Sequence, residues 1–380
     1  MAGVRLLVLC PSFPGTSPGS RFRIEQWIPH LETRGVSVQL CSFEDQELHS
    51  VIYVPGRHFR KARLLVRALV RRLRLLRGLA DRFDAVFIYE EAARLGPAVI
   101  ERALARMRVP VVYDFCDPIW IPYVSPINRH LARLKFPGKT ATICRLSAHV
   151  LVGNEELAAY ARRFNPRVTI VPITIDTDCY RPSVTPRQPE IPVVGWSGSH
   201  STVPHLDTLR PVLAELARRR RFTLRVIGTS RYEAPGVTVD ARDWRLESEV
   251  EDLASFDVGV MPLPDDQWTR LRSHLKVRQY MGLGLPSVVS PVGVNRELVQ
   301  DGVNGYLAKS AEEWLSRLIP LLDDQDLRSR IGHAARQTIE ERFSAREWAG
   351  IVLEVISGVV PGRLRGTATS RQRRESTPSD

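Results

Sequence analysis

Two cations four residues apart, Arg272 and Lys276, stand where the sequence predicts the start of a helix. The helix is expected to end at the turn 282–286, because its glycines allow a close approach and its proline stops a helix. The start of a helix presents unpaired backbone N–H groups and a partial positive charge. Cations beside such a helix start are suited to binding a phosphate group. The more ordinary interpretation is a plain helix, turn and strand of an α/β core.

A second candidate phosphate site follows the apolar strand predicted at 193–196. Small residues form the turn after this strand: Gly195, Ser197, Gly198 and Ser199. A turn without bulky side chains lets backbone N–H groups approach a phosphate closely. A simple strand-to-helix connection explains the same residues without a ligand.

Composition indicates a globular protein with more than one domain. The chain has 380 residues, of which 43% are hydrophobic and 25% are charged. This length is large for a single core, so we expect two domains. The five cysteines include no CxxC pair, which favours a reducing compartment and no zinc site. We expect no metal and no cofactor, since there is no HExxH motif and both DxD spacings lie away from the candidate phosphate sites.

The apolar run at the start of the sequence is too short for the full pattern of a signal peptide. No other run approaches membrane-spanning length. We therefore expect a soluble, cytoplasmic protein.

Strands and helices alternate along the sequence, which predicts an α/β fold with parallel sheets. Strands are expected at 4–10, 85–89, 111–115, 149–152 and 258–261, among others. Continuous helices are expected at 23–34 and 206–219, and a helical stretch interrupted at 137–138 is expected over 129–147. Residues 1–172 are expected to form one domain, 173–192 a proline-rich linker and 193–344 a second domain. Residues 345–360 are predicted to be a helix that crosses back to the first domain, and 361–380 a disordered tail. Two such domains place a cleft between the C-terminal edges of their sheets, where ligands of open α/β sheets bind.

The net charge of +12 is concentrated in a basic amphipathic helix near residues 57–79. Four arginines recur at helical spacing opposite an apolar stripe, namely Arg63, Arg67, Arg71 and Arg74 against Val66, Leu69, Val70, Leu73 and Leu76. One interpretation is a solvated surface helix whose apolar stripe packs on the sheet. The alternative is peripheral contact with an anionic bilayer surface. We expect no nucleic-acid partner, because no recognition module is present.

The chain resembles family-4 (group 1) glycosyltransferases of the GT-B fold. The stretches that carry the resemblance follow in order along almost the whole sequence: residues 14–23, 111–117, 152–157, 194–199, 256–263, 276–286, 291–295 and 301–305. The resemblance implies two Rossmann-like domains with parallel sheets facing across a cleft. It also implies transfer of a sugar from a nucleotide-sugar donor, held by the C-terminal domain, to an acceptor hydroxyl on the N-terminal side, with retention of configuration.

The resemblance and the residue types together give a candidate site. Lys276 and Arg272 are expected to stabilise the negative charge that builds on the departing diphosphate. The expected donor-binding residues are Gly15, Gly19, Gly195, Ser197, Gly198, Ser199, Trp244, Ser273, His274 and Gln279. Relatives often carry Arg and Lys where Ser199 and His200 stand here.

The sequence departs from the family at two acidic positions. Aligned on 284–286, these positions hold Leu271 and Gln279. A glutamine can still hydrogen-bond ribose hydroxyls, whereas a leucine cannot replace a carboxylate. Trp244 could pack against the base, or could equally belong to the core.

Carboxylates at the ends of two predicted strands are candidates for the acceptor side. Asp114 and Asp117 follow one strand, and Glu90 and Glu91 follow another. Such a group could orient an acceptor hydroxyl or accept its proton. Ion pairs with the abundant arginines explain the same residues equally well.

Other functions remain open at this point. A non-catalytic nucleotide-sugar-binding protein and a sugar-nucleotide epimerase fit the same pattern. A dehydrogenase is disfavoured, because neither domain opens with GxGxxG. The acceptor, whether a glycan, a lipid-linked or a small molecule, is not specified by the sequence.

Overall fold

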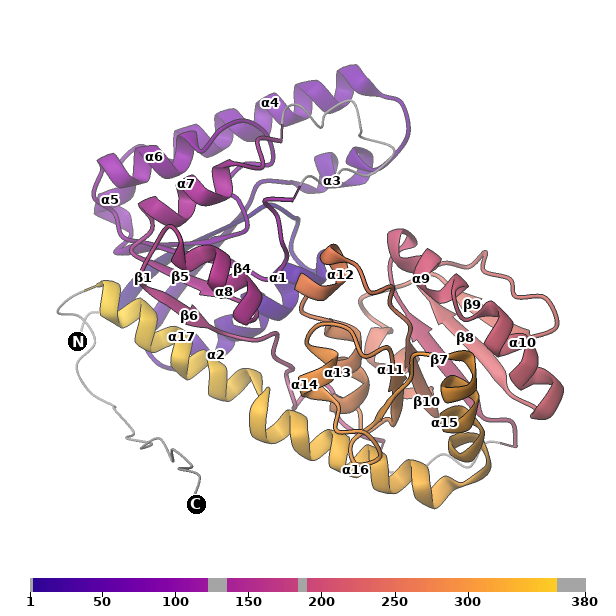
Figure 1. The fold of residues 1–380 in the computed structure, drawn as a ribbon. Coiled ribbons are helices and arrows are strands. Elements are labelled where there is room, and N and C mark those ends of the chain that lie inside the picture. The colour runs from indigo at the N-terminus through magenta and orange to yellow at the C-terminus, as the bar shows by residue number, and fades with distance from the viewer. Residues whose placement is uncertain (1–2, 122–134, 184–189, 361–380) are drawn as a thin grey trace, which may run out of the picture.

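The computed structural model describes residues 3–121, 135–183 and 190–360. In this part of the chain two parallel six-stranded sheets lie side by side, each covered by helices (Figure 1). The predicted α/β fold with two parallel sheets is confirmed. The predicted tail at 361–380 and residues 129–134 of a predicted helix fall outside the described residues.

The N-terminal sheet has the strand order β2-β1-β3-β4-β5-β6. Its strands are β1 (Val4–Cys10), β2 (Val36–Ser42), β3 (Ala85–Tyr89), β4 (Val111–Phe115), β5 (His149–Val152) and β6 (Val168–Ile170). Its helices are α1 (Pro18–Arg23), η1 (Glu25–Trp27), α2 (Ile28–Glu32), α3 (Gln46–Ile52), α4 (His58–Leu75), α5 (Leu79–Arg82), α6 (Val99–Arg106), α7 (Lys139–Leu146) and α8 (Glu155–Arg162). Every residue of β3 and β4 is buried, which explains why β3 is a continuous apolar run and why Asp114, the one charged residue of β4, needs a buried partner.

The C-terminal sheet has the strand order β12-β11-β10-β7-β8-β9. Its strands are β7 (Val193–Ser197), β8 (Thr223–Ile227), β9 (Thr238–Arg242), β10 (Val258–Met261), β11 (Ser287–Val289) and β12 (Tyr306–Leu307). The helices of this domain are η3 (His200–Thr202), α9 (Val203–Asp207), α10 (Arg210–Arg219), α11 (Glu249–Ala254), α12 (Gln267–Leu271), α13 (Leu275–Gly282), α14 (Asn295–Leu298), α15 (Ala311–Asp323) and α16 (Gln325–Arg342).

The last helix, α17 (Ala345–Val359), returns to the N-terminal domain and packs on α2, η1 and β4. In Figure 1 the yellow helices α16 and α17 run one after the other beneath the two domains. The two places where the chain passes between the domains lie together. Ile175 N donates to Phe343 O at 2.8 Å, and Ala345 N donates to Ile175 O at 2.9 Å, so Ile175 and Ser344 form a parallel bridge.

Two helices predicted as continuous are interrupted. The one predicted at 23–34 is divided into α1, η1 and α2, and the one predicted at 206–219 into α9 and α10. In both cases a proline, Pro29 or Pro211, occupies the first turn of the later helix. Proline cannot donate the backbone hydrogen bond that a continuous helix needs, so a new helix begins there.

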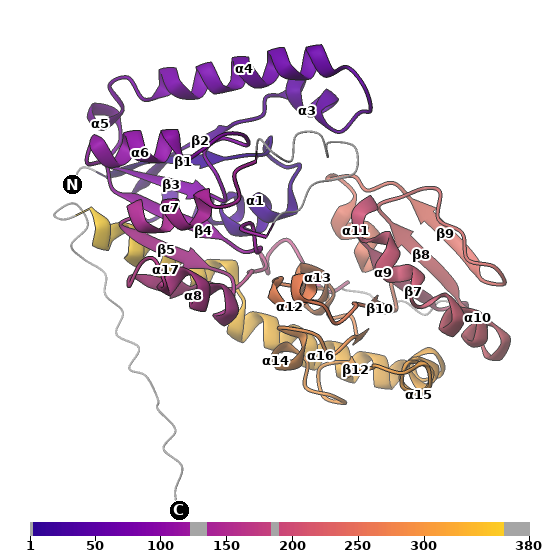
Figure 2. The ribbon, with the colours of Figure 1, turned by 45° about the horizontal axis from the view of Figure 1, so that its top comes forward.

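The apolar stripe of α4 faces outward, which corrects the first interpretation of the basic helix. Leu64, Leu65 and Ala68 are buried against α3 and its neighbours. Four of the five residues expected to pack on the sheet are instead exposed: Val66 (60%), Leu73 (41%), Val70 (38%) and Leu69 (37%). The fifth, Leu76, is half-buried and packs against the N-terminal core. In both ribbon views α4 lies along the outer edge of the N-terminal domain (Figures 1 and 2). None of the helices in the described ranges is both long and apolar enough to cross a bilayer.

Candidate functional site

A cavity of about 420 Å³ lies between the two domains, beside the C-terminal ends of β7 and β10. Both domains line it. The N-terminal domain contributes Thr16, Pro18, Gly19, Cys116 and Asp117, and the C-terminal domain contributes residues that include 197–199, Trp244, Glu249, 272–276 and Gln279. Most of the residues that the sequence suggested for donor binding therefore line this cavity.

The turn after β7 comes very close to α13 and to the end of β8. A Cβ atom on Gly198 would lie 2.6 Å from Lys276 Nζ and 2.5 Å from Thr202 Oγ1. Gly228 has a φ of +122°, and its Cβ would lie 1.7 Å from the carbonyl oxygen of Gly198. Only glycine fits at either position, so this part of the cavity wall is bare backbone.

Lys276 lies in the first turn of α13 and has no carboxylate partner among the described residues. Its Nζ lies 4.2 Å from the centre of the Trp196 ring and 3.4 Å from Thr202 Oγ1. Burial, together with the charge of Arg272, lowers the pKa of Lys276 to about 7. An anion that enters the cavity would restore the charged form of this lysine.

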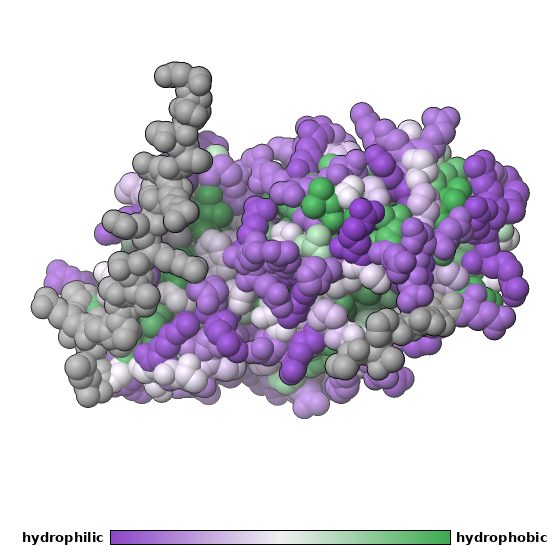
Figure 3. Space-filling view, turned by 90° about the horizontal axis from the view of Figure 1, so that it is seen from below, coloured by the Kyte–Doolittle hydropathy of each residue, from purple (hydrophilic) through white to green (hydrophobic). Residues whose placement is uncertain are grey.

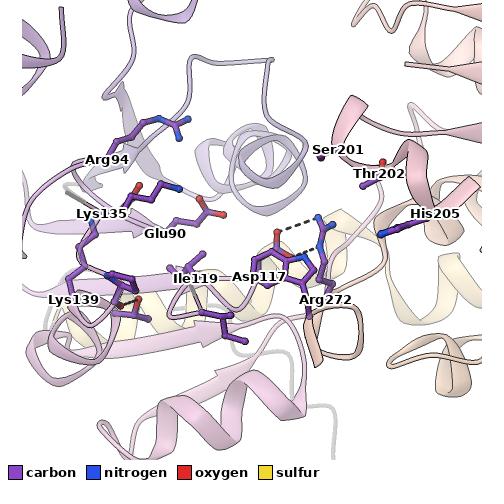
Figure 4. A pocket seen from close by; sticks show the side chains of 15 residues that line it. Glu90, Arg94, Asp117, Ile119, Lys135, Lys139, Ser201, Thr202, His205 and Arg272 are labelled. Carbon is purple, nitrogen blue, oxygen red and sulfur yellow. Dashed lines mark hydrogen bonds and ion pairs between the residues drawn. The ribbon is translucent and has the colours of Figure 1, made fainter. Parts of the chain in front are cut away.

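Arg272 is held across the cleft by a carboxylate of the opposite domain. Its Nε lies 3.2 Å from Asp117 Oδ1, as the dashed lines in Figure 4 show. The loop before α13 is fixed to the N-terminal domain at two further points. Asn154 Nδ2 donates to Leu271 O at 2.9 Å, and Ser273 Oγ donates to Cys116 O at 2.9 Å.

His274 determines the shape of this loop. Its φ of +48° turns the backbone into α13, and its ring is buried. Nε2 donates to Thr269 O at 2.7 Å, while Nδ1 lies 2.9 Å from Asn295 Oδ1. Burial lowers the pKa of His274 to about 4, while its hydrogen bonds to Thr269 and Asn295 act in the opposite direction.

The other end of the cavity contains a hydrogen-bonded network that the sequence did not suggest. Glu249, at the start of α11, accepts from Trp244 Nε1 at 2.9 Å and from Tyr180 OH at 2.7 Å. Tyr180 OH in turn accepts from Gln279 Nε2 at 3.1 Å. Arg21 of the N-terminal domain pairs with Glu249, and its guanidinium lies 5.4 Å from the centre of the Trp244 ring. No motif or spacing links these residues, because they come from separate segments.

Three predicted site residues lie outside this cavity, namely Gly195, Gly15 and Asp114. Gly195 is in the core of the C-terminal sheet, where a Cβ would lie 2.0 Å from the Phe256 ring. Gly15 has a φ of +78° and packs near Leu246, so it shapes the loop after β1. Gly19 does line the cavity, and a Cβ there would lie 2.0 Å from Tyr89 OH.

Asp114 is the third, and its surroundings do not fit the catalytic role expected of it. Both Asp114 and Arg23 have fully buried side chains, and they form an ion pair inside the N-terminal domain. Arg23 also donates to the carbonyl groups of Val171 and Pro172. This aspartate therefore anchors α1 and the end of the N-terminal sheet to each other. Asp117, three residues later, reaches the cavity.

A second cavity, of about 330 Å³, adjoins the first on the N-terminal side (Figure 4). Both cavities are lined by Asp117, Thr202, His205 and Arg272. The second also contains the carboxylates Glu90 and Glu91 and the cations Arg94, Lys135 and Lys139. In the described ranges no group of three or more His, Cys, Asp and Glu side chains is placed to hold a metal ion.

The C-terminal half of the cleft belongs to a segment that matches a known family. Residues 191–324, which carry the small-residue turn, Arg272, Lys276 and Gln279, match the family model of glycosyl transferases group 1. The C-terminal domain is a group 1 glycosyltransferase domain. The resemblance expected from the sequence is thereby confirmed. No curated protein matches the sequence.

Solved structures of glycosyltransferases share the fold over nearly the whole chain. Sucrose-phosphate synthase from Thermosynechococcus elongatus matches with a TM-score of 0.66 and 13% identity, over 93% of this chain and 98% of that one. A glycosyltransferase from Rickettsia africae matches with a TM-score of 0.65 and 12% identity, over 95% and 100%. Anabaena HepE in complex with UDP and glucose matches with a TM-score of 0.64 and 15% identity, over 93% and 100%. The predicted GT-B fold is confirmed by these matches.

Proposed function

We propose that this group 1 glycosyltransferase transfers a sugar from a UDP-sugar to an acceptor hydroxyl with retention of configuration. The observation that carries the proposal is the pairing of Lys276 with the bare backbone at Gly198 in one cavity. The nucleotide is proposed to be uridine diphosphate, because the similar Anabaena HepE was solved with UDP and with UDP-glucose.

The diphosphate is the part of the donor that this cavity suits best. As the glycosidic bond breaks, negative charge builds on the β-phosphate, and groups placed there in advance stabilise the transition state most. The amino group of Lys276 and the backbone of residues 198 and 199 line this part of the cavity, although the N–H of Gly198 already donates to Ile227 O at 2.9 Å. Arg272 is close enough to exchange Asp117 for a phosphate oxygen.

The nucleoside is proposed to occupy the end of the cavity near Trp244 and Gln279. Both residues line the cavity, and both belong to the network around Glu249. The amide of Gln279 retains an oxygen that can accept from a ribose hydroxyl. Glu249 supplies a carboxylate at this end, although the sequence lacks one at position 279.

Retention is proposed from the resemblance and from the state of the cavity carboxylates. Asp117 is ion-paired with Arg272, and Glu249 is ion-paired with Arg21, so neither is placed as a strong base. In the proposed step the bond between C1 and the β-phosphate oxygen breaks while the bond from C1 to the acceptor oxygen forms on the same face. The proton of the acceptor hydroxyl passes to the departing phosphate.

A panel of nucleoside diphosphates and nucleotide sugars tests this function. UDP should raise the melting temperature more than ADP or GDP, because a ligand that binds only the folded state stabilises it more the more tightly it binds. The anomeric configuration of the product, read by NMR, should equal that of the donor. A donor epimerised without any acceptor would show an epimerase instead, and UDP binding without turnover on any acceptor would show a binding protein.

We further propose that the outer face of α4 rests on an anionic bilayer at the cytoplasmic side of a membrane. Phe59 is 85% exposed at the start of α4, and Val66, Val70 and Leu73 continue the same face. Arg63 and Arg74 flank this face and form no ion pair with any described residue. On the face turned away from α4, hydrophilic side chains predominate (Figure 3). An apolar stripe flanked by arginines is the chemistry that anionic headgroups and acyl chains favour.

A further inference from the structure

The second cavity contains one carboxylate that its surroundings do not neutralise. Glu91 pairs with Lys139 at 2.6 Å, and Asp117 pairs with Arg272. Glu90 forms no ion pair with any residue in the described ranges; its Oε1 accepts from Tyr89 OH at 3.0 Å. Figure 4 shows the Glu90 side chain extending into the space between the lysines and Asp117.

The backbone at Glu90 is held in an uncommon conformation. Its φ is +55°, in the left-handed region that side chains other than glycine seldom occupy. Two hydrogen bonds hold it there: Glu90 N donates to Asp114 O at 2.7 Å, and Tyr113 OH donates to Glu90 O at 2.8 Å. Strained residues persist where the surrounding structure enforces them, and they are concentrated at functional sites. The strain here turns the Glu90 side chain toward the cleft at the C-terminal end of β3.

The cations of this cavity are already engaged. Arg94 pairs with the buried Glu44 at 2.6 Å, and Lys139 pairs with Glu91. Lys135 has an interaction of its own, and burial lowers its pKa. An anionic acceptor would therefore meet an additional carboxylate without gaining an unpaired cation from the described residues. An uncharged polyol would gain hydrogen bonds to Glu90.

We infer that the second cavity binds a neutral carbohydrate acceptor and that Glu90 accepts a hydrogen bond from one of its hydroxyl groups. The apolar side chains of Ile119, Ile121 and Trp268 line the same cavity and suit the C–H face of a sugar ring. The shared wall of Asp117 and Arg272 places this acceptor directly beside the proposed donor site. The inference rests on the proposed transferase function and specifies its substrate class.

The surroundings of Glu90 also predict how acceptor binding depends on pH. Burial, then the charges of Asp117 and Glu91, raise the pKa of Glu90, while the Tyr89 hydroxyl and Arg94 lower it, with a result of about 7. Lys135 and Lys139 on the N-terminal side and Arg272 and His205 on the C-terminal side complete the charged and titratable lining. Because the ionised carboxylate is the better hydrogen-bond acceptor, affinity for a neutral sugar should rise between pH 6 and pH 8.

Binding of simple glycosides in the presence of saturating UDP tests the inference. Methyl glucoside, methyl galactoside and methyl mannoside are the neutral probes, and glucose 6-phosphate and glucuronate are the anionic ones. At least one neutral probe should bind more tightly than both anionic probes. Glu90→Gln should raise its Kd about tenfold or more, since a hydrogen bond to a charged group is lost, and should remove the pH dependence. Tyr89→Phe, which leaves Glu90 less firmly held, should raise the Kd by a smaller factor.

Matched measurements separate the possible results. Glu155→Gln removes an exposed carboxylate on α8 and should leave the Kd unchanged. Melting temperatures confirm that each variant is folded. Tighter binding of the anionic probes, binding of none of the probes, or an unchanged Kd in Glu90→Gln would overturn the inference. If UDP itself does not bind the wild-type protein, the proposed function fails, whereas UDP binding with an unchanged Glu90→Gln contradicts only the acceptor site.

Discussion

At the scale of single residues, the cleft combines a lysine and a glutamate that form no ion pair with any residue that the structure describes. Lys276 faces the turn at Gly198, and Glu90 faces the adjoining cavity. In each case burial disfavours the ionised form of the side chain in the free protein. A ligand that brings an opposite charge or a hydrogen-bond donor would favour the ionised form again, so ligand binding and ionisation are coupled. Variants of Lys276 and of Glu90 therefore test the proposed donor site and the proposed acceptor site separately.

Replacing Lys276 by methionine should lower kcat on the order of 10²–10³-fold, as removal of a single donor to a transition-state charge does. The fold should be retained or slightly stabilised, because a half-buried amine is replaced by an apolar chain of similar length. Steady-state kinetics and a thermal melt measure the two effects. Lys309→Met, at an exposed lysine of the same domain, is the control. Near-normal turnover of Lys276→Met would place the phosphate site elsewhere.

UDP binding should be accompanied by proton uptake at Lys276. The pKa of this lysine is about 7 in the free protein, so the neutral form predominates above pH 7. The diphosphate raises the pKa of the lysine, and the bound state therefore holds more protons than the free state. Affinity should fall as pH rises from 7.5 to 9, by at most about tenfold per pH unit. Titration calorimetry in buffers of different ionisation enthalpy measures the uptake, which should vanish in Lys276→Met.

At the scale of elements, Asp114 and Asp117 show how one strand end supplies both structure and function. Asp114 belongs to β4 and is fully buried with Arg23, whereas the Asp117 side chain, two residues beyond β4, is 27% exposed at the cavity. Asp114→Asn should cost on the order of 3–5 kcal/mol of stability, because Arg23 would remain buried without its partner. Asp117→Asn should reduce activity with little loss of stability. Denaturant unfolding of the two variants compares them, and similar unfolding midpoints would contradict this division of roles.

The exposed face of α4 gives the prediction for membrane contact. The protein should bind vesicles containing phosphatidylserine but not neutral vesicles, and salt should release it. Arg63→Gln with Arg74→Gln should weaken binding about 30-fold at low ionic strength, since each arginine near the surface contributes about 1 kcal/mol. The same loss of charge at Arg221 and Arg330, exposed on the C-terminal domain, should have little effect. Equal effects of the two pairs would mean that only net charge matters.

Much of the element order could be predicted, because buried strands appear in the sequence as short apolar runs. β3, β4, β5 and β10 begin and end at the predicted residues. Lys276 and the glycine turn were also predictable, since each lies at a local boundary between strand and helix. The network of Arg21, Tyr180 and Glu249 was not, because its members are brought together only by folding. The direction of the α4 stripe was missed for a related reason: both faces of the helix carry apolar residues, and only packing decides which is buried.

At the scale of the whole molecule, the geometry of the site depends on how the two domains sit together. Arg21 reaches Glu249, Asn154 reaches the carbonyl of Leu271, and Ser273 reaches the carbonyl of Cys116. These contacts hold the donor cavity and the loop before α13 from the N-terminal side. A change in the angle between the domains would therefore move Arg272, in this loop, relative to Lys276, which lies in the first turn of α13 and is packed on Trp196.

The bridge between Ile175 and Ser344 makes the C-terminal domain an insertion in a discontinuous N-terminal domain. Residues 176–343 leave and return at one point, and α17 completes the core that the first 175 residues begin. Each unit should then fold without the other, because each sheet has a core cluster of its own, and only the contacts across the cleft and at the crossing are lost. Residues 176–343 expressed alone should show a cooperative melt and bind UDP, more weakly than the whole chain. Residues 3–175 joined to 344–360 by a few glycines should also melt cooperatively, whereas residues 3–175 alone, lacking α17, should not. The proposed donor half of this enzyme is thus in a position where it could be exchanged for that of another glycosyltransferase, with the proposed acceptor half left intact.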